Sequence, residues 1–398
     1  MSYEVGLLGF AALVAVGILL HHPSRTLGVP SLLIFMGVGL LIGNGEFNFD
    51  YDNLQLTSSI GTAALNIIVF VGGLNTSMGN IRVAWREGGM LSSIGVLLTI
   101  GCMGLMMNLI FDMPLILCFL FAAIVSSTDA AAVFSILESK KLKLKEHTDT
   151  VLEFESATND PIAMIMVLLL TQMALNSELS LSTNQMMMTL CQQVFIGVAG
   201  GYLVGQLGAW LLNQVRLPEF GQIPVFILCC FVLAAYGTAA LGGNILIAAY
   251  VAGVILGNNV LRGMEVSRHF FNSLAWLAQS LMFVVLGLQL SPQQLWSVLF
   301  ISLLPAILLM LIARPLAVWL CYLPFRKVSK RKRVFISAIG LRGATPIVFA
   351  LIPAAAGVSG GVEMKHMVFF TVLISILFQG SLLEPLARKL DLIEEPKK

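Results

Sequence analysis

The sequence predicts an all-α polytopic membrane protein with thirteen transmembrane helices. Of its 398 residues, 58% are hydrophobic and only 11% are charged, whereas charged residues make up about 25% of an average soluble domain. Apolar stretches of membrane-spanning length follow one another from end to end and leave no room for a separate soluble domain. A soluble enzyme is therefore excluded, and nucleic acid is not a candidate partner.

The thirteen spans follow from windows of about 18 to 25 predominantly apolar residues. The first has no basic leader or cleavage pattern, so we expect a retained helix rather than a signal peptide. In order, the expected spans are 5–21, 30–44, 57–77, 90–110, 115–137, 153–175, 184–213, 221–241, 243–258, 270–290, 296–323, 334–356 and 366–387.

The lysines and arginines lie almost entirely on one side of these spans. Of the 23, 20 fall in the odd-numbered loops and the C-terminal tail, two lie within spans, and Lys365 alone occupies an even-numbered loop. Cytoplasmic loops show this bias, so we expect the N-terminus outside, the C-terminus in the cytoplasm and an odd number of spans. Topology is the favoured explanation of the basic run 326–333, and a patch that binds lipid or a partner is the alternative.

The seventh span, 184–213, is longer than a bilayer requires. Its thirty residues would extend about 45 Å as a helix, so the span must tilt or protrude. Gly197, Gly201 and Gly205 recur at a spacing of four, which lets another helix approach closely. We expect a helix that connects two bundles, with a span packed inside one bundle as the alternative.

Polar groups interrupt the fifth and sixth spans at mid-depth. In the fifth, hydroxyl groups at 126–128 lead to the carboxylate of Asp129. In the sixth, five of the six positions 155–160 are polar, and Ser156 and Asp160 share a helical face. A charge at the bilayer centre costs about 2.5 to 3.5 kcal/mol on insertion scales. Carboxylates, hydroxyls and free carbonyls are the ligands that hard cations prefer, so we expect a cation site here. The alternative is that these polar residues only hold helices together by hydrogen bonds.

The twelfth span carries a second interruption. Gly340, Gly343 and Pro346 should break its helix. Spans five and twelve are seven apart, and an odd offset means opposite orientations in the bilayer. We therefore expect spans four to six and eleven to thirteen to form inverted repeats with two broken helices that cross at the midplane, the architecture of a secondary transporter.

Two arginines within the spans need partners. We expect Arg314 to pair with Glu155, which lies about 100° around its helix from Ser156, and snorkelling to the interface is the alternative. Arg342 either supports the crossing by binding carbonyl ends or repels cations from one side. We favour the structural role.

These residues resemble the monovalent cation:proton antiporter-1 family, which includes the bacterial NhaP-type antiporters and the animal sodium/proton exchangers. The resemblance covers essentially the whole chain and rests on Thr128-Asp129, the motif at 155–160, Arg314 and the motif at 340–343. The run 126–135 is most similar to the bacterial potassium/proton branch. The family implies the sodium/proton antiporter fold, in a homodimer in the bacterial inner (plasma) membrane.

The resemblance also divides the chain into a core domain that moves against a dimerisation domain. Its segments are 1–89 (dimerisation, helices one to three), 90–175 (core, helices four to six), 184–213 (linker helix seven), 221–290 (dimerisation, helices eight to ten), 296–387 (core, helices eleven to thirteen) and 388–398 (cytoplasmic tail).

By the same resemblance, Asp160 would hold a cation and a proton in turn. The other site residues would be Thr128, Asp129 and Ser156 as further cation ligands, and Asn159, Glu155, Arg314 and Arg342 as residues that organise the site. The Asn-Asp pair at 159–160, where electrogenic relatives have two aspartates, implies electroneutral exchange.

Two departures from the family pattern stand out. Many relatives carry an acid where this chain has Val71, so Asn159 must be held differently. Potassium-branch relatives often continue into cytosolic regulatory domains, so a chain that stops at Lys398 is expected to be a truncated transport module.

The predicted function is exchange of a monovalent cation, K⁺ or Na⁺ with K⁺ favoured, for H⁺ by an antiporter without a cofactor. Burial disfavours the charged carboxylate and a bound cation favours it, so cation and proton compete for Asp160. A cation channel is the alternative, but no filter loop is present in the sequence. An intramembrane enzyme would need a nucleophile with a base, or a metal motif, and a sensor or scaffold would not account for acids at mid-depth.

Overall fold

The computed structural model describes residues 8, 11, 15, 31–44, 53–129, 133, 142–175, 183–215, 219, 221–290 and 292–394. Within these ranges, eight helices are long and apolar enough to cross a membrane, and four shorter apolar helices lie among them. The prediction of an all-helical membrane protein is confirmed. Most of the first span and of the segment 130–141 lies outside the described residues.

The first half of the chain forms long helices, and one apolar stretch is interrupted after Ser126, where α6 ends. Its elements are α2 (Ser31–Asn44), α3 (Leu54–Asn75), α4 (Met78–Met90), the π-helical turn η1 (Leu91–Gly95), α5 (Val96–Phe111), α6 (Leu115–Ser126), the short η2 (Lys145–His147) and α8 (Thr148–Leu175). Helices α4 and α5 join through η1, so the helix that contains the fourth span begins at Met78 rather than near residue 90.

The second half contains the remaining helices and a second interruption, at 339–343 between α16 and α17. They are α9 (Thr183–Gln214), α10 (Gln222–Val232), η3 (Leu233–Gly237), α11 (Thr238–Ala240), α12 (Ile245–Asn259), α13 (Met264–Leu288), α14 (Pro292–Leu308), η4 (Leu309–Ala313), α15 (Arg314–Cys321), α16 (Lys330–Ala338), α17 (Ala344–Ala355) and α18 (Gly361–Lys389).

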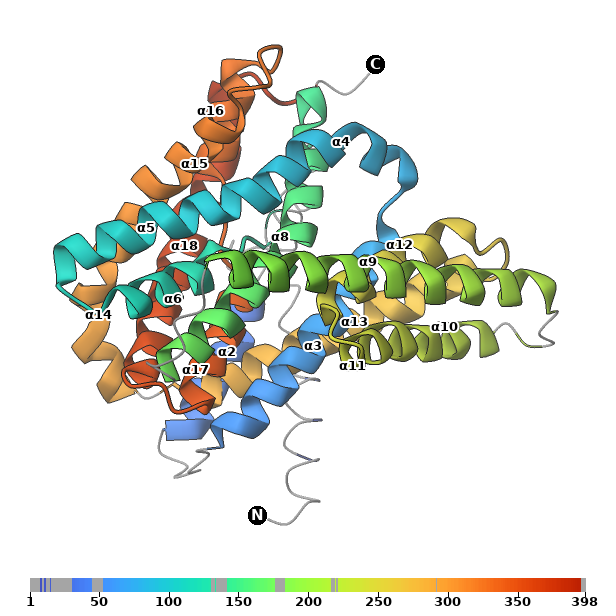
Figure 1. Cartoon of the computed structure of the whole chain (residues 1–398), viewed down its shortest axis with the longest axis horizontal. Helices are drawn as coiled ribbons and strands as arrows, with labels where there is room; N and C mark the ends of the chain where they lie inside the picture. The colour runs from blue at the N-terminus through green and yellow to red at the C-terminus, as the bar shows by residue number, and fades with distance from the viewer. Residues whose placement is uncertain are drawn as a thin grey trace.

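The helices form two groups that meet along α3, α8 and α17. Figure 1 shows α5, α6, α14 and α18 on one side of the molecule and α9, α10 and α12 on the other. The second group encloses an apolar core around Phe70, whose ring packs against Phe231 and Phe271. Helix α8 contacts α4 and α6 on one side and α12 on the other, so its side chains face both groups.

The glycines of α9 bring this helix against α12, as their spacing predicts. A Cβ atom at Gly201 would lie 2.5 Å from the carbonyl oxygen of Ala248, and one at Gly205 would lie 2.9 Å from Cβ of Ile255. Larger residues would therefore separate the two helices. Helix α9 lies across α12 in Figure 1 and is 32 residues long.

Lys365 does not lie in a loop, contrary to the sequence prediction. Helix α18 starts at Gly361, directly after Gly360 in the left-handed conformation, and so begins five residues before the predicted span 366–387. Lys365 is 4% exposed, and its ammonium group donates to the Gln289 carbonyl at 2.9 Å. Helix boundaries thus extend beyond hydropathy windows where the polar groups find partners.

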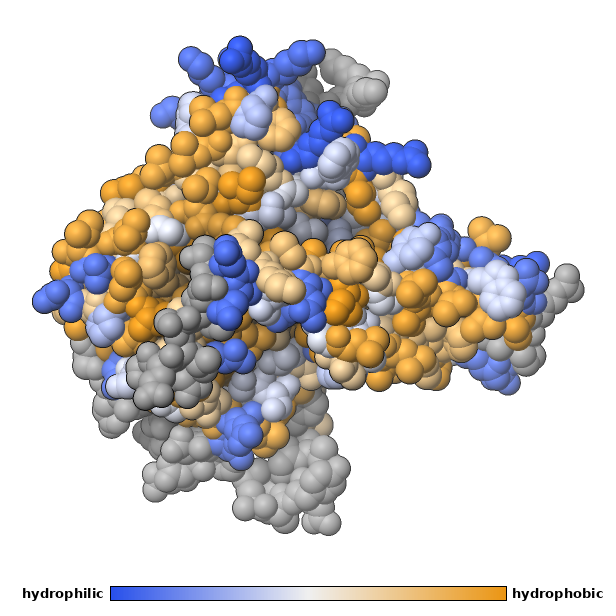
Figure 2. Space-filling view, viewed as in Figure 1, coloured by the Kyte–Doolittle hydropathy of each residue, from blue (hydrophilic) through white to orange (hydrophobic). Residues whose placement is uncertain are grey.

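The surface is that of a membrane protein. Figure 2 shows broad apolar areas on the visible face, a large group of hydrophilic residues at the end formed by α16, and smaller hydrophilic groups in the middle and at the right-hand end. Large side chains such as Leu109, Phe195 and Phe300 are more than 70% exposed. Extended apolar surface of this kind indicates contact with lipid or another apolar partner.

Candidate functional site

Helix α6 ends at Ser126 within an apolar stretch. Ser127 takes an extended conformation, and the chain is not helical from there to Asp129. Hydroxyl side chains compete with the backbone for hydrogen bonds, and the Ser126 hydroxyl donates to the Ala123 carbonyl at 2.7 Å. The last carbonyls of the helix then have no helical partner.

The second break, at 339–343 between α16 and α17, contacts the first. The Asp129 backbone N–H donates to the Leu341 carbonyl at 2.8 Å. Arg342 is 1% exposed, and its Nη1 donates to the carbonyls of Ser126 and Ser127 at 2.6 and 2.7 Å. The guanidinium thus caps the negative end of α6, which is the contact expected of the structural role.

Gly343 allows the two breaks to lie this close together. A Cβ atom at this position would overlap the Asp129 side chain, and it would lie 2.6 Å from the Asp129 Cβ. That atom moves only with the backbone, so a larger residue would displace the segment and not merely rotate the carboxylate.

Asp160 lies on α8 beside both breaks and is 6% exposed. The Ser127 hydroxyl donates to its Oδ1, and the Thr345 hydroxyl, in the first turn of α17, donates to its Oδ2 at 3.4 Å. No ion pair within the described part of the chain involves Asp160. The carboxylate is therefore held by neutral hydroxyl groups, one from each interrupted span.

A second polar group joins α8 to the first break. The hydroxyls of Thr128 and Ser156 are 3.0 Å apart, and the Asn159 amide donates to Thr128 Oγ1 at 2.5 Å. Val71 is buried in the wall of the adjacent cavity. Thr128 thus provides the contact that holds Asn159.

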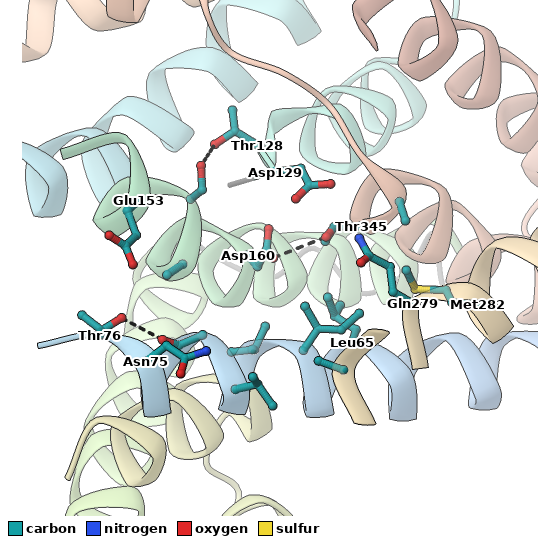
Figure 3. Close-up of a pocket in the computed structure, with 18 residues that line it drawn as sticks. Leu65, Asn75, Thr76, Thr128, Asp129, Glu153, Asp160, Gln279, Met282 and Thr345 are labelled. Atoms are coloured by element: carbon teal, nitrogen blue, oxygen red, sulfur yellow. Dashed lines mark hydrogen bonds between the residues drawn. The ribbon is translucent and has the colours of Figure 1, made fainter. Parts of the chain in front are cut away.

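The site opens into a cavity of about 310 Å³ between α3, α8, α13 and α17. Thr128, Asp129, Ser156 and Asp160 all line it, so the four predicted cation ligands share one space. Figure 3 shows Asp160 facing Thr345 in the middle of this space. A water molecule occupies about 30 Å³ of liquid, so the cavity has room for a cation with several waters.

The predicted ion pair between Glu155 and Arg314 is present in the structure. Arg314 Nη1 lies 2.6 Å from Glu155 Oε1, and both side chains are at most 4% exposed. Arg314 directly follows the π-helical turn η4, and Pro315 after it has no N–H to donate. The pair is not among the residues that line the cavity.

Two residues that touch Asp160 were absent from the predicted site, Ser127 and Thr345. Both belong to the interrupted segments, so their hydroxyl groups beside the breaks were the available signal. Glu153 also lines the cavity and was not predicted, because it lies at the first residue of the expected sixth span, where a charge needs no explanation.

Comparison with known proteins places this site in a family. The sequence profile of the family described as sodium/hydrogen exchanger, transmembrane, matches residues 10–389. The K(+)/H(+) antiporter NhaP2 of Shewanella sp. (strain ANA-3) is 37% identical over 393 residues, which cover 98% of this chain and 67% of that protein. The K(+)/H(+) antiporter NhaP of Alkalimonas amylolytica is 37% identical over 375 residues, 94% of this chain and 64% of that protein. This chain thus spans about two thirds of the length of these relatives.

A solved structure extends the comparison to the fold. The sodium proton antiporter MjNhaP1 from Methanocaldococcus jannaschii at pH 8 superimposes with a TM-score of 0.82 over 98% of this chain and 99% of that one, at 20% sequence identity. The expected resemblance is therefore confirmed, and the chain belongs to the sodium/hydrogen exchanger family of membrane antiporters.

Proposed function

We propose that this protein exchanges a monovalent cation, K⁺ in preference to Na⁺, for H⁺, and that Asp160 holds the two ions in turn. The observation that carries the proposal is a buried carboxylate with hydroxyl partners only, at the wall of a cavity that admits water and a cation. The preference for K⁺ rests on the two similar relatives named K(+)/H(+) antiporters.

Competition for one carboxylate is sufficient for exchange. A cation binds the ionised form of Asp160 and disfavours protonation, and a proton removes the charge that attracts the cation. An empty, ionised site would have to carry a bare carboxylate through an apolar barrier, at a cost of several kcal/mol. The loaded forms are neutral at this group and avoid that cost.

The charges near the site support an exchange of one cation for one proton. Among the described residues, three carboxylates lie at mid-depth, those of Asp129, Glu155 and Asp160. The two buried arginines are Arg342, in the second break, and Arg314, at the start of α15. Glu153 lies about 10.5 Å from Asp160 along α8, so at the crossing itself two positive charges offset two of the three negative charges. One carboxylate remains to be neutralised by either a cation or a proton, so a complete cycle moves no net charge.

The further oxygen ligands would come from the same cavity wall. Thr128 and Ser156 present hydroxyl oxygens, and Asp129 presents a carboxylate. Oxygen donors suit hard cations. Asn159 would orient Thr128, Arg342 would hold the crossing of the two breaks, and Glu155 with Arg314 would fix α8 against η4 and α15.

Alternating access would come from the movement of two domains. The proposed core comprises 90–175 and 296–387, in which two inverted repeats each contribute one broken helix to the crossing. The proposed dimerisation domain comprises 1–89 and 221–290, joined to the core by 184–213 and assembled in a homodimer. With the N-terminus outside and the tail 388–398 in the cytoplasm of a bacterium, the basic loops obey the positive-inside bias.

Proton flux in proteoliposomes tests this function. Purified protein is reconstituted with a pH-sensitive dye inside, and gradients of K⁺, Na⁺ and Li⁺ are imposed in turn. We expect cation-driven proton flux in the wild type, fastest with K⁺, and none in Asp160→Asn. The matched control is Asp112→Asn, because Asp112 is exposed and has the left-handed conformation that asparagine also tolerates.

An imposed membrane potential separates the alternatives. An electroneutral antiporter gives the same flux at every potential, whereas a channel gives a current that follows it. Flux that persists in Asp160→Asn would refute the assignment of Asp160, and a wild type without cation-driven proton flux would refute the function.

A further inference from the structure

Glu153 is a carboxylate of α8 that the proposed exchange does not use. It lines the same cavity as Asp160 and is partly exposed there. No hydrogen bond or ion pair joins its carboxylate to any residue that the structure describes. Because an unpaired charge is unfavourable in an apolar setting, its carboxylate depends on the water or ions of the cavity.

The position of Glu153 along α8 is two turns from Asp160. Seven residues at 1.5 Å each place the two about 10.5 Å apart along the helix axis, on the same face. Figure 3 shows Glu153 toward one end of the cavity and Asp160 in its middle. Glu153 is nearer to the N-terminus of α8, which the basic loops predict to be the cytoplasmic side.

The cavity wall opposite Glu153 is polar and carries no charge. Asn75, the last residue of α3, and Thr76 lie there opposite α8 (Figure 3). Among the described residues that line the cavity there is no lysine, arginine or histidine, so no positive charge offsets the carboxylate within its walls.

We infer that Glu153 is a positioning residue for transport, which collects a monovalent cation at the end of the cavity and delivers it to Asp160. This inference rests on the proposed exchange at Asp160. A carboxylate in a narrow cavity with low-dielectric walls raises the local concentration of cations. Glu153 would thus lower the cation concentration needed for half-maximal exchange without taking part in the exchange step itself.

Kinetics at low ionic strength test the inference. In Glu153→Gln we expect the KM for K⁺ to rise about tenfold, the size expected for one charge about 10 Å away at an effective dielectric constant near 20, with an unchanged maximal rate. Added choline chloride should shrink the difference, because salt screens exposed charges. Glu153→Asp, which keeps the charge, should stay near the wild-type KM. The matched control is Asp112→Asn, an exposed acid in the turn between α5 and α6 and outside the cavity lining, which should change KM little.

A second measurement does not depend on transport. In a background whose six native cysteines are replaced by alanine, Asn75→Cys is labelled with a cationic and with an anionic methanethiosulfonate reagent. Glu153 should favour the cationic reagent, and Glu153→Gln should reduce the ratio of the two rates several-fold. This arm reports on Glu153 even if the protein exchanges no cation, so a failed function and a failed inference are distinguishable.

Two results would overturn the inference. One is a Glu153→Gln variant with the wild-type KM at low ionic strength, or with a reduced maximal rate at unchanged KM. The other is a labelling ratio that does not depend on residue 153.

Discussion

Two carboxylates on helix α8, five residues apart, have opposite surroundings. Glu155 is 1% exposed and forms an ion pair with Arg314. Asp160 is 6% exposed, faces a cavity and accepts hydrogen bonds from hydroxyl groups alone. Five residues turn a helix by about 140° relative to its starting face, so the two acids face different neighbours. The same chemical group therefore forms an ion pair at one position and, at the other, remains available for the ion exchange proposed above.

This contrast predicts that the two acids respond differently to neutralisation. Removing one partner of a buried ion pair leaves the other charge uncompensated. Neutralising an unpaired buried carboxylate instead eliminates an uncompensated charge. Stability should depend on Glu155 and exchange should depend on Asp160.

The largest expected change in stability comes from Glu155→Gln, which strands Arg314. We expect the free energy of unfolding to fall by about 3–5 kcal/mol, measured by denaturation in detergent micelles. Asp160→Asn should show no such loss. In the double variant Glu155→Gln with Arg314→Met, part of the stability should return, since neither charge remains. A double variant no more stable than the single one would argue against the pair.

A smaller effect is expected from Gly343→Ala, which disturbs the wall of the cavity beside Asp160. The added Cβ overlaps the Asp129 side chain, and overpacking of this kind costs about 1–3 kcal/mol. Exchange should fall along with stability because Asp129 is displaced. Gly101→Ala is the control, because apart from the neighbouring backbone of its own helix no atom lies within 4 Å of its added Cβ. Equal effects of the two substitutions would contradict the close contact between the breaks.

The smallest effect is expected at a third acid, Asp391, whose ion pairs are exposed. Lys145 at 2.9 Å and Arg331 at 3.1 Å surround its carboxylate, and the hydrogen bond from Lys145 is the main reason why the pKa of Asp391 lies below its ordinary value. A lowered pKa in the folded state stabilises the protein above the ordinary value, and this stabilisation is lost as the pH falls through the folded-state pKa.

Asp391→Asn should therefore leave exchange unchanged and alter the melting temperature only slightly at pH 7, since exposed pairs contribute little. The difference from wild type should shrink with added salt. It should begin to decrease as the pH falls below 3.8, the ordinary pKa, and it should vanish only below the lower pKa of the folded state. A loss as large as that of Glu155→Gln would show that burial does not explain the contrast.

The sequence predicted the parts of the site that follow from the cost of burying charge. Arg314 in an apolar span required an acid, and Glu155 was the acid on the correct face of its helix. The two interruptions were predicted because serine, glycine and proline end helices at known positions. The contact of Thr345 with Asp160 and the place of Glu153 in the cavity wall were not predicted, since they depend on how α17 and α3 lie against α8, which periodicity does not determine.

Helix boundaries were predicted less well than the existence of the helices. Hydropathy windows end where polar residues begin, but α4 and α18 continue through polar turns whose side chains find partners. Lys365 shows the reason, because its ammonium group is satisfied by the Gln289 carbonyl and no longer marks the edge of a span.

The most direct test of the central proposal is the KM for K⁺ as a function of pH in the wild-type protein. If cation and proton compete for Asp160, acidification by one pH unit should raise KM by up to about tenfold, because the competing proton is ten times more concentrated, while the maximal rate at saturating K⁺ is preserved. A KM that stays constant while the maximal rate falls would contradict competition for a single carboxylate.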